Sequence, residues 1–182
     1  MKSRGKKVKP VRDTLYGRDL LAESKRLEPG RWGGEFETAF IECVGKGLDY
    51  ASIAKRFGIS YEMAQYTVRR LLMRYRVLGV LDKGLDVMRN HGDKIASTGL
   101  TATQTEVLQM LLAGGSQAEA AQALHITQAA VSSRLRLASR LLNKAAEGEN
   151  NDWIQPLVEA VKIRRNRNTI TGFQRKRRKK QS

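Results

Sequence analysis

Side chains that could form hydrogen bonds with the edges of bases gather in two short stretches, which begin at Ser60 and Thr127. If each stretch is helical, these side chains lie on the face opposite its apolar residues. Amide, hydroxyl, carboxylate and guanidinium groups are the donors and acceptors that read base pairs in the major groove. A helix surface that is merely solvated has a similar composition, so the prediction depends on the surrounding motif. The predicted base-facing residues are Ser60, Tyr61, Glu62, Gln65, Tyr66 and Arg69 in the first stretch, and Thr127, Gln128, Ala129, Ser132, Ser133 and Arg136 in the second.

Positive charge is concentrated at the two ends of the chain. The net charge is +16 over 182 residues, and residues 1–12 and 162–182 contain 16 Lys or Arg and no acidic residue. Such segments cannot bury enough apolar surface to order themselves, so we expect a disordered basic arm at 1–12 and a disordered basic tail at 169–182. A basic run of this kind suits nucleic acid, an anionic membrane or, in a eukaryotic host, a nuclear import receptor. We favour the phosphate backbone of nucleic acid as the partner. The predicted phosphate contacts are Arg70, Arg74 and Arg134 in the body of the chain, and Arg175, Lys176, Arg177, Arg178, Lys179 and Lys180 in the tail.

The two polar stretches belong to two copies of one pattern, residues 50–72 and 117–139, which are offset by 67 residues. In each copy a short apolar helix is followed by a tight turn and by a Ser or Thr that can cap the next helix. A small residue, Ala54 or Ala121, stands where two helices that cross steeply must approach closely. The pattern predicts two helix-turn-helix motifs.

The turn residue differs between the copies. Gly58 suits a left-handed helix end, whereas its counterpart, His125, is a residue type that adopts this conformation only at some cost. We expect His125 to be structural rather than a metal ligand, because no cysteine lies at metal-binding spacing from it.

The second copy resembles the DNA-binding domain of LuxR/GerE-type regulators and the related promoter-reading domain of sigma factors. The resemblance covers residues 100–142 and implies a compact four-helix unit whose third helix enters the major groove. Residues 35–78 form a looser second copy. Such domains usually carry a basic residue just after the position of Val131 and a histidine two positions further on, but this chain has Ser132 and Ser133 followed by Arg134, so base preference cannot be transferred. The matching residues are Leu100, Thr101, Glu106, Val107, Leu108, Gly114, Ser116, Glu119, Ala121, Leu124, Ile126, Thr127, Val131 and Leu135.

Apolar residues recur at helical spacing almost throughout, which predicts a mainly α fold. Thr101 and Gln104 have the spacing of a capping box. Residues 77–88 could form a small β wing, or a fourth helix and a loop. The predicted parts are an N-terminal helical unit at 13–78, a linker or wing at 79–99, a LuxR-like unit at 100–146 and a C-terminal helix at 152–168. The apolar stripe of this last helix could dock on the LuxR-like unit, which we favour, or could form an oligomerisation or partner-binding surface.

Catalytic chemistry finds no support in the sequence. There is no glycine-rich phosphate loop, no HExxH and no CxxC, so we expect no enzyme, no metal and no cofactor. The single cysteine, Cys43, lies in an apolar run and is predicted to be buried. No apolar stretch is long enough to span a membrane, which predicts a cytoplasmic, nucleoid-associated protein, or a nuclear or virion-associated one in a eukaryotic or viral host.

These features predict a sequence-specific transcriptional regulator that binds double-stranded DNA as a monomer with tandem reading units. Because the two predicted base-facing surfaces differ, the preferred site should be asymmetric. Three alternatives share the same features. They are a sigma-like factor with RNA polymerase as partner, a viral or plasmid DNA-packaging or replication-initiation component, and a structural binder of any DNA sequence.

Overall fold

The computed structural model describes residues 9–27, 34–148 and 150–165. All regular secondary structure in these ranges is helical, with nine α-helices and two short 3-10 helices. This confirms the predicted mainly α fold. The chain divides into two compact units, one ending at Gly79 and the other beginning at Val80.

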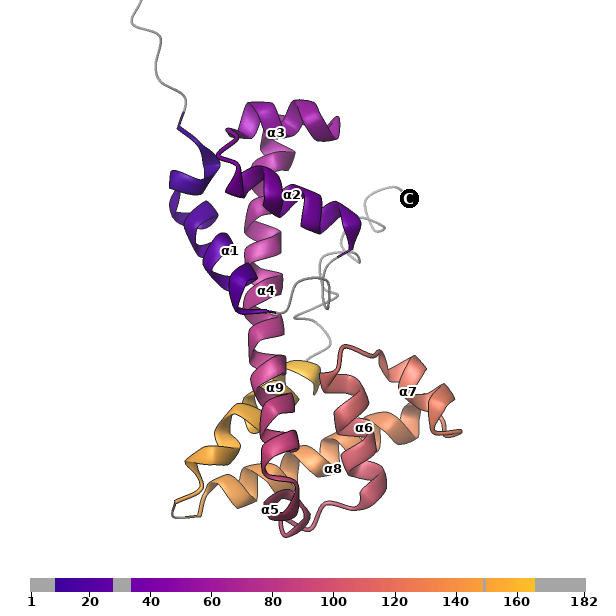
Figure 1. Ribbon diagram of the computed structural model, residues 1–182. Helices are drawn as coiled ribbons and strands as arrows, with labels where there is room; N and C mark the ends of the chain where they lie inside the picture. The colour runs from indigo at the N-terminus through magenta and orange to yellow at the C-terminus, as the bar shows by residue number, and fades with distance from the viewer. Residues whose placement is uncertain (1–8, 28–33, 149, 166–182) are drawn as a thin grey trace, which may run out of the picture. The chain divides into compact units, whose positions relative to one another are not determined.

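The first unit is built from short helices that bury one apolar face each. Phe40, Ile53 and Val68 come from three different helices and are fully buried. Cys43 is buried among them, as predicted. The elements are η1 (Val11–Asp13), α1 (Leu15–Arg26), α2 (Glu35–Gly45), α3 (Tyr50–Phe57) and the N-terminal part of α4 (Tyr61–Asn90). Figure 1 shows α3 lying across the N-terminal end of α4.

The second unit contains the rest of α4 and all the later elements. These are α5 (Gly92–Ala96), α6 (Ala102–Leu112), α7 (Gln117–Ala123), α8 (Gln128–Ala146), η2 (Asp152–Ile154) and α9 (Gln155–Arg165). Helix α9 packs on α8 and α6, and its Leu157, Val158 and Val161 are buried. The C-terminal helix therefore docks on the unit, as predicted. The capping box of Thr101 and Gln104 is also present at the start of α6.

The duplication is longer in the structure than in the sequence pattern. Both bounds of α6 lie 67 residues after the matching bounds of α2, so a third helix belongs to the repeat. Each of these helices ends in a turn with a left-handed glycine, Gly47 with φ of 82° and Gly114 with φ of 104°. A buried polar side chain, Glu37 or Gln104, occupies the same place in both helices. Each repeat is therefore a unit of three helices.

The same offset separates the third helices, but their ends differ. Helix α8 ends at Ala146, whose counterpart in the first repeat is Gly79. There α4 continues without a break to Asn90, and the boundary between the compact units falls at this point. The first repeat thus ends where its unit ends, and the remaining turns of α4 belong to the second unit.

This continuation corrects the prediction for residues 77–99. Residues 77–88 form neither a wing nor a loop, because all of them lie within α4. Residues 80–90 are part of α4, and a short connection that contains α5 separates α4 from α6, so residues 79–99 are mostly helical. The sequence Asp82-Lys83-Gly84 suggests a turn, but Gly84 is buried against α9. A Cβ at this glycine would lie 2.5 Å from the Cβ of Ala160. The close packing of two helices explains the glycine there.

Candidate nucleic-acid interface

The two helix-turn-helix motifs, α3–α4 and α7–α8, have the same backbone hydrogen bond across their turns. The amide of Ile59 donates to the carbonyl of Ala54, and the amide of Ile126 donates to that of Ala121, both at 3.0 Å. Both alanines are buried, and their small side chains leave room for the following helix. The turn geometry predicted from the repeat is therefore present in both copies.

The turn residues adopt the left-handed conformation expected of them. Gly58 has φ of 61° and His125 has φ of 51°. The His125 side chain is exposed, and the described residues include no group of His, Cys, Asp or Glu that could hold a metal ion. The role that the structure shows for His125 is therefore that of the left-handed residue in the turn.

Ser60 and Thr127 begin the second helix of each motif. Their hydroxyl oxygens accept hydrogen bonds from the amides of Met63 and Ala130, both at 3.1 Å. Each hydroxyl is exposed and still carries a proton that it can donate. These residues therefore cap helices, whether or not they also contact a ligand.

The predicted face of α4 points outward, away from the first core. Tyr61, Glu62, Tyr66 and Arg69 are exposed, and Gln65 is half-buried. The opposite face, which includes Ala64, Thr67, Val68, Leu71 and Leu72, is buried. The surface that the sequence assigned to base contacts is thus accessible in the first unit.

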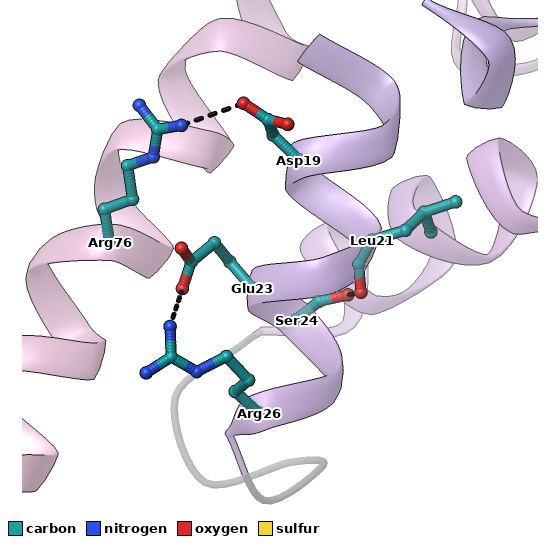
Figure 2. Close-up of polar contacts among 6 residues, drawn as sticks. All are labelled: Asp19, Leu21, Glu23, Ser24, Arg26 and Arg76. Atoms are coloured by element: carbon teal, nitrogen blue, oxygen red, sulfur yellow. Dashed lines mark hydrogen bonds and ion pairs between the residues drawn. The ribbon is translucent and has the colours of Figure 1, made fainter. Parts of the chain in front are cut away.

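The cationic side chains of this helix are largely engaged within the first unit. The guanidinium of Arg69 lies 4.9 Å from the centre of the Tyr16 ring, in a cation–π contact with α1. Arg76 forms an ion pair with Asp19 of α1 at 2.9 Å, which Figure 2 shows beside the pair of Glu23 and Arg26. These contacts connect α4 to α1, so Arg69 and Arg76 have a structural role before any ligand binds.

Arg74, predicted to contact phosphate, instead pairs with the buried carboxylate of Glu37 on α2. Burial raises the pKa of the neighbouring Tyr75, and the negative charge of Glu37 raises it further. Loss of the Arg74 guanidinium would leave a charge buried without its partner, which is costly. Arg70, in contrast, is exposed and forms no ion pair with any residue that the structure describes.

The corresponding face of α8 borders a groove. Gln128, Ala129, Ser132 and Arg136 are exposed, and Ser133 is half-buried. The groove lies along this face and has a volume of about 440 Å³. Its lining residues are Gln117 of α7, Ala129, Ser132, Ser133, Leu135 and Arg136 of α8, and Arg165 of α9.

Gln117 and Arg165 were not among the predicted site residues. The sequence did contain one signal that pointed to this region, because α8 carries three arginines and one lysine and no acidic residue. Arg165 could not be placed beside α8 from the sequence, since its position depends on how α9 docks.

The predicted phosphate contact Arg134 is only partly available. Its side chain is half-buried, and its Nη1 is buried without a hydrogen-bond partner in the described part of the chain. The predicted contacts Arg175, Lys176, Arg177, Arg178, Lys179 and Lys180 lie outside the described residues, as do residues 1–8 of the basic arm. The prediction of a disordered arm over 1–12 is wrong at its end, because Val11 and Arg12 belong to η1 and Val11 is fully buried in the first unit.

Among the described helices, none is both long and apolar enough to cross a membrane. Comparison of the chain with protein-family models, with curated proteins and with solved structures found no match.

Proposed function

We propose that this chain is a sequence-specific, double-stranded DNA-binding protein that regulates transcription through two tandem helix-turn-helix units. The observation that carries the proposal is the matched pair of motifs, each with a capped second helix whose polar face is exposed. In helix-turn-helix proteins this second helix lies in the major groove. In that position, α4 and α8 would present their exposed polar side chains to the edges of the bases.

The two units supply different chemistry for recognition. The face of α4 carries Tyr61 and Tyr66, whose exposed rings can contact sugars and base methyl groups. The face of α8 carries Ala129 and Ser132, whose short side chains allow a close approach of the helix backbone. A preferred site read by both helices would therefore be asymmetric rather than palindromic.

Selection of bound fragments from random duplexes, followed by sequencing, tests this function directly. A long asymmetric consensus supports reading by both units, and a short consensus supports reading by one. Uniform recovery of all sequences would contradict specific recognition and favour a structural DNA binder.

A matched pair of variants tests whether α8 reads bases. Gln128 begins α8 on the predicted reading face, whereas Gln109 is exposed on α6 and does not line the groove beside α8. Gln128→Ala should weaken binding to the selected site by about 1 to 3 kcal/mol relative to random duplex, because a bidentate amide contact is lost. Gln109→Ala should leave both affinities unchanged. Equal losses for the two variants would exclude base reading by Gln128.

The basic ends are proposed to hold the chain on the DNA backbone. For six to ten phosphate contacts, affinity falls by roughly a thousand- to a hundred-thousand-fold between 50 and 200 mM salt. Deletion of residues 1–8 and 170–182, which leaves the buried Val11 of η1 in place, should make this dependence much weaker while the selected consensus stays the same. An unchanged salt dependence would show that the ends make no phosphate contacts.

A further inference from the structure

The groove beside α8 has the chemistry of an anion-binding site. Two guanidinium groups, those of Arg136 and Arg165, border it together with the hydroxyls of Ser132 and Ser133. These groups are hydrogen-bond donors, and no acidic side chain lines the groove. The nearest acidic residue along α7 is Glu119, whose carboxylate accepts a hydrogen bond from the amide of Ser116 at 2.6 Å.

The two arginines are not neutralised within the unit. Within the part of the chain that the structure describes, neither Arg136 nor Arg165 forms an ion pair. In the first unit, by comparison, Arg74 and Arg76 both pair with carboxylates. Two like charges that share a groove repel each other, and a bound anion would remove that repulsion. Planar guanidinium groups suit phosphate because they can donate two parallel hydrogen bonds.

The docking of α9 fixes Arg165 at this position. Val158 and Val161 are buried in the contact with α8 and α6, which anchors the middle of the helix. The next-to-last residue of α9, Arg164, is half-buried with its Nε enclosed by protein, and burial lowers its pKa. The last turn of α9 therefore packs against the unit, and Arg165 extends from it into the groove.

We propose that this groove binds a phosphate of the DNA backbone, held by Arg136 and Arg165. The inference rests on the proposed function and extends it, because it makes α9 part of the DNA-binding surface. It also changes the role of Arg136, which the sequence assigned to a base. With Arg136 and Arg165 on one phosphate, α8 is held in register on the duplex, and Gln128 and Ala129 near its N-terminus remain available for base edges.

The test measures duplex affinity of the full chain against salt concentration for Arg165→Gln, Arg165→Lys and the control Lys144→Gln. Lys144 is exposed in the last turn of α8 and does not line the groove, so its variant loses the same charge elsewhere. Loss of one phosphate contact should reduce the slope of log K against log salt by about 0.9. Arg165→Gln should therefore shrink the affinity change between 50 and 200 mM salt by roughly threefold, equally on the selected site and on random duplex.

The other two variants should keep the wild-type slope, since Arg165→Lys retains the charge and Lys144→Gln lies outside the groove. Fluorescence of Trp153, which precedes α9, checks in a Trp32→Phe background that each variant keeps the docked helix. An unchanged slope for folded Arg165→Gln, or an equal change for Lys144→Gln, overturns the phosphate site and leaves the proposed function standing.

Two further outcomes concern the ligand itself. If the wild-type chain binds no duplex at all, the proposed function and the phosphate site both fail. If single-stranded RNA binds more tightly than duplex DNA and only RNA binding responds to Arg165→Gln, the assignment of the groove to DNA is wrong.

Discussion

Replacing Gly58 with alanine should destabilise the first unit, whereas the same replacement at Gly45 should stabilise it. Gly58 ends α3 in the left-handed conformation, with φ of 61°. A Cβ built at this position would have no atom within 4 Å, so the effect comes from the backbone conformation alone. Gly45 is the last residue of α2, and a Cβ there would lie 3.8 Å from Leu21 Cδ2, an ordinary contact distance.

The magnitudes follow from these two conformations. A left-handed alanine costs roughly 1 to 2 kcal/mol, and the smaller entropy of the unfolded chain returns about 0.4 to 1 kcal/mol. Gly58→Ala should therefore lower the free energy of unfolding by about 1 kcal/mol. At Gly45 the backbone is helical, so both helix propensity and unfolded-state entropy favour alanine, by about 0.5 to 1 kcal/mol.

Hydrogen exchange of the α3 amides, followed by mass spectrometry on the full chain, reports the stability of this unit separately from the other. A change of 1 kcal/mol corresponds to about a fivefold change in the population that exchanges. Exchange of α3 should thus become about fivefold faster in Gly58→Ala and two- to fivefold slower in Gly45→Ala. If Gly58→Ala exchanges at the wild-type rate or more slowly, the left-handed turn is absent and the first motif is not a helix-turn-helix.

Two further predictions concern the second unit. Gly84→Ala should destabilise it by about 1 to 3 kcal/mol, because the new methyl group would overlap the Cβ of Ala160. Adding Ala160→Gly should restore much of the loss in urea unfolding, followed by Trp153 fluorescence in a Trp32→Phe background, and additive losses would contradict the contact. Hydrogen bonds from the backbone and side chain of Ser116 lower the pKa of Glu119, so their stabilisation is present above the ordinary glutamate pKa and is lost as pH falls through the lowered value. Ser116→Ala should raise the Glu119 pKa only part of the way, since the backbone amide remains, and an unchanged value in a carboxyl-carbon NMR titration would contradict the capping box.

The two motifs were predictable because their determinants are local. The turn at Gly58, the caps at Ser60 and Thr127, and the capping box of Thr101 and Gln104 each depend on residues within five positions of one another. Because the partners of these hydrogen bonds are a fixed number of residues apart, their spacing can be recognised in the sequence. The predicted helical fold and the two turns follow from such patterns.

The extent of α4 was not predictable in the same way. Gly84 is a weak helix former, and beside Asp82 and Lys83 it favours a turn when only local preference is considered. Its helical conformation is stabilised by packing against Ala160, which lies far along the chain. Tertiary contact here overrides local propensity, and a single sequence does not reveal it.

The roles of the cationic side chains depend on distant partners for the same reason. Arg74 and Arg76 find their carboxylates 37 and 57 positions away, on helices whose arrangement the repeat pattern does not specify. From the sequence they could not be distinguished from Arg136, which has no ion pair with a described residue. The sequence indicates which residues carry charge, and the fold decides which charges remain available.

The two units share one backbone arrangement, but the availability of their arginines differs, so we propose that they contribute differently to DNA binding. In the first unit, contacts to α1 and α2 occupy Arg69, Arg74 and Arg76, so a phosphate would have to compete with them for each guanidinium. In the second unit, Arg136 and Arg165 border an open groove and have no such competitor among the described residues. In the first unit, Arg70 is the one predicted phosphate contact that is exposed and has no ion pair with a described residue. Apart from Arg70, short-range attraction to the DNA backbone should therefore come mainly from the second unit, and the first should contribute through the exposed aromatic and polar face of α4.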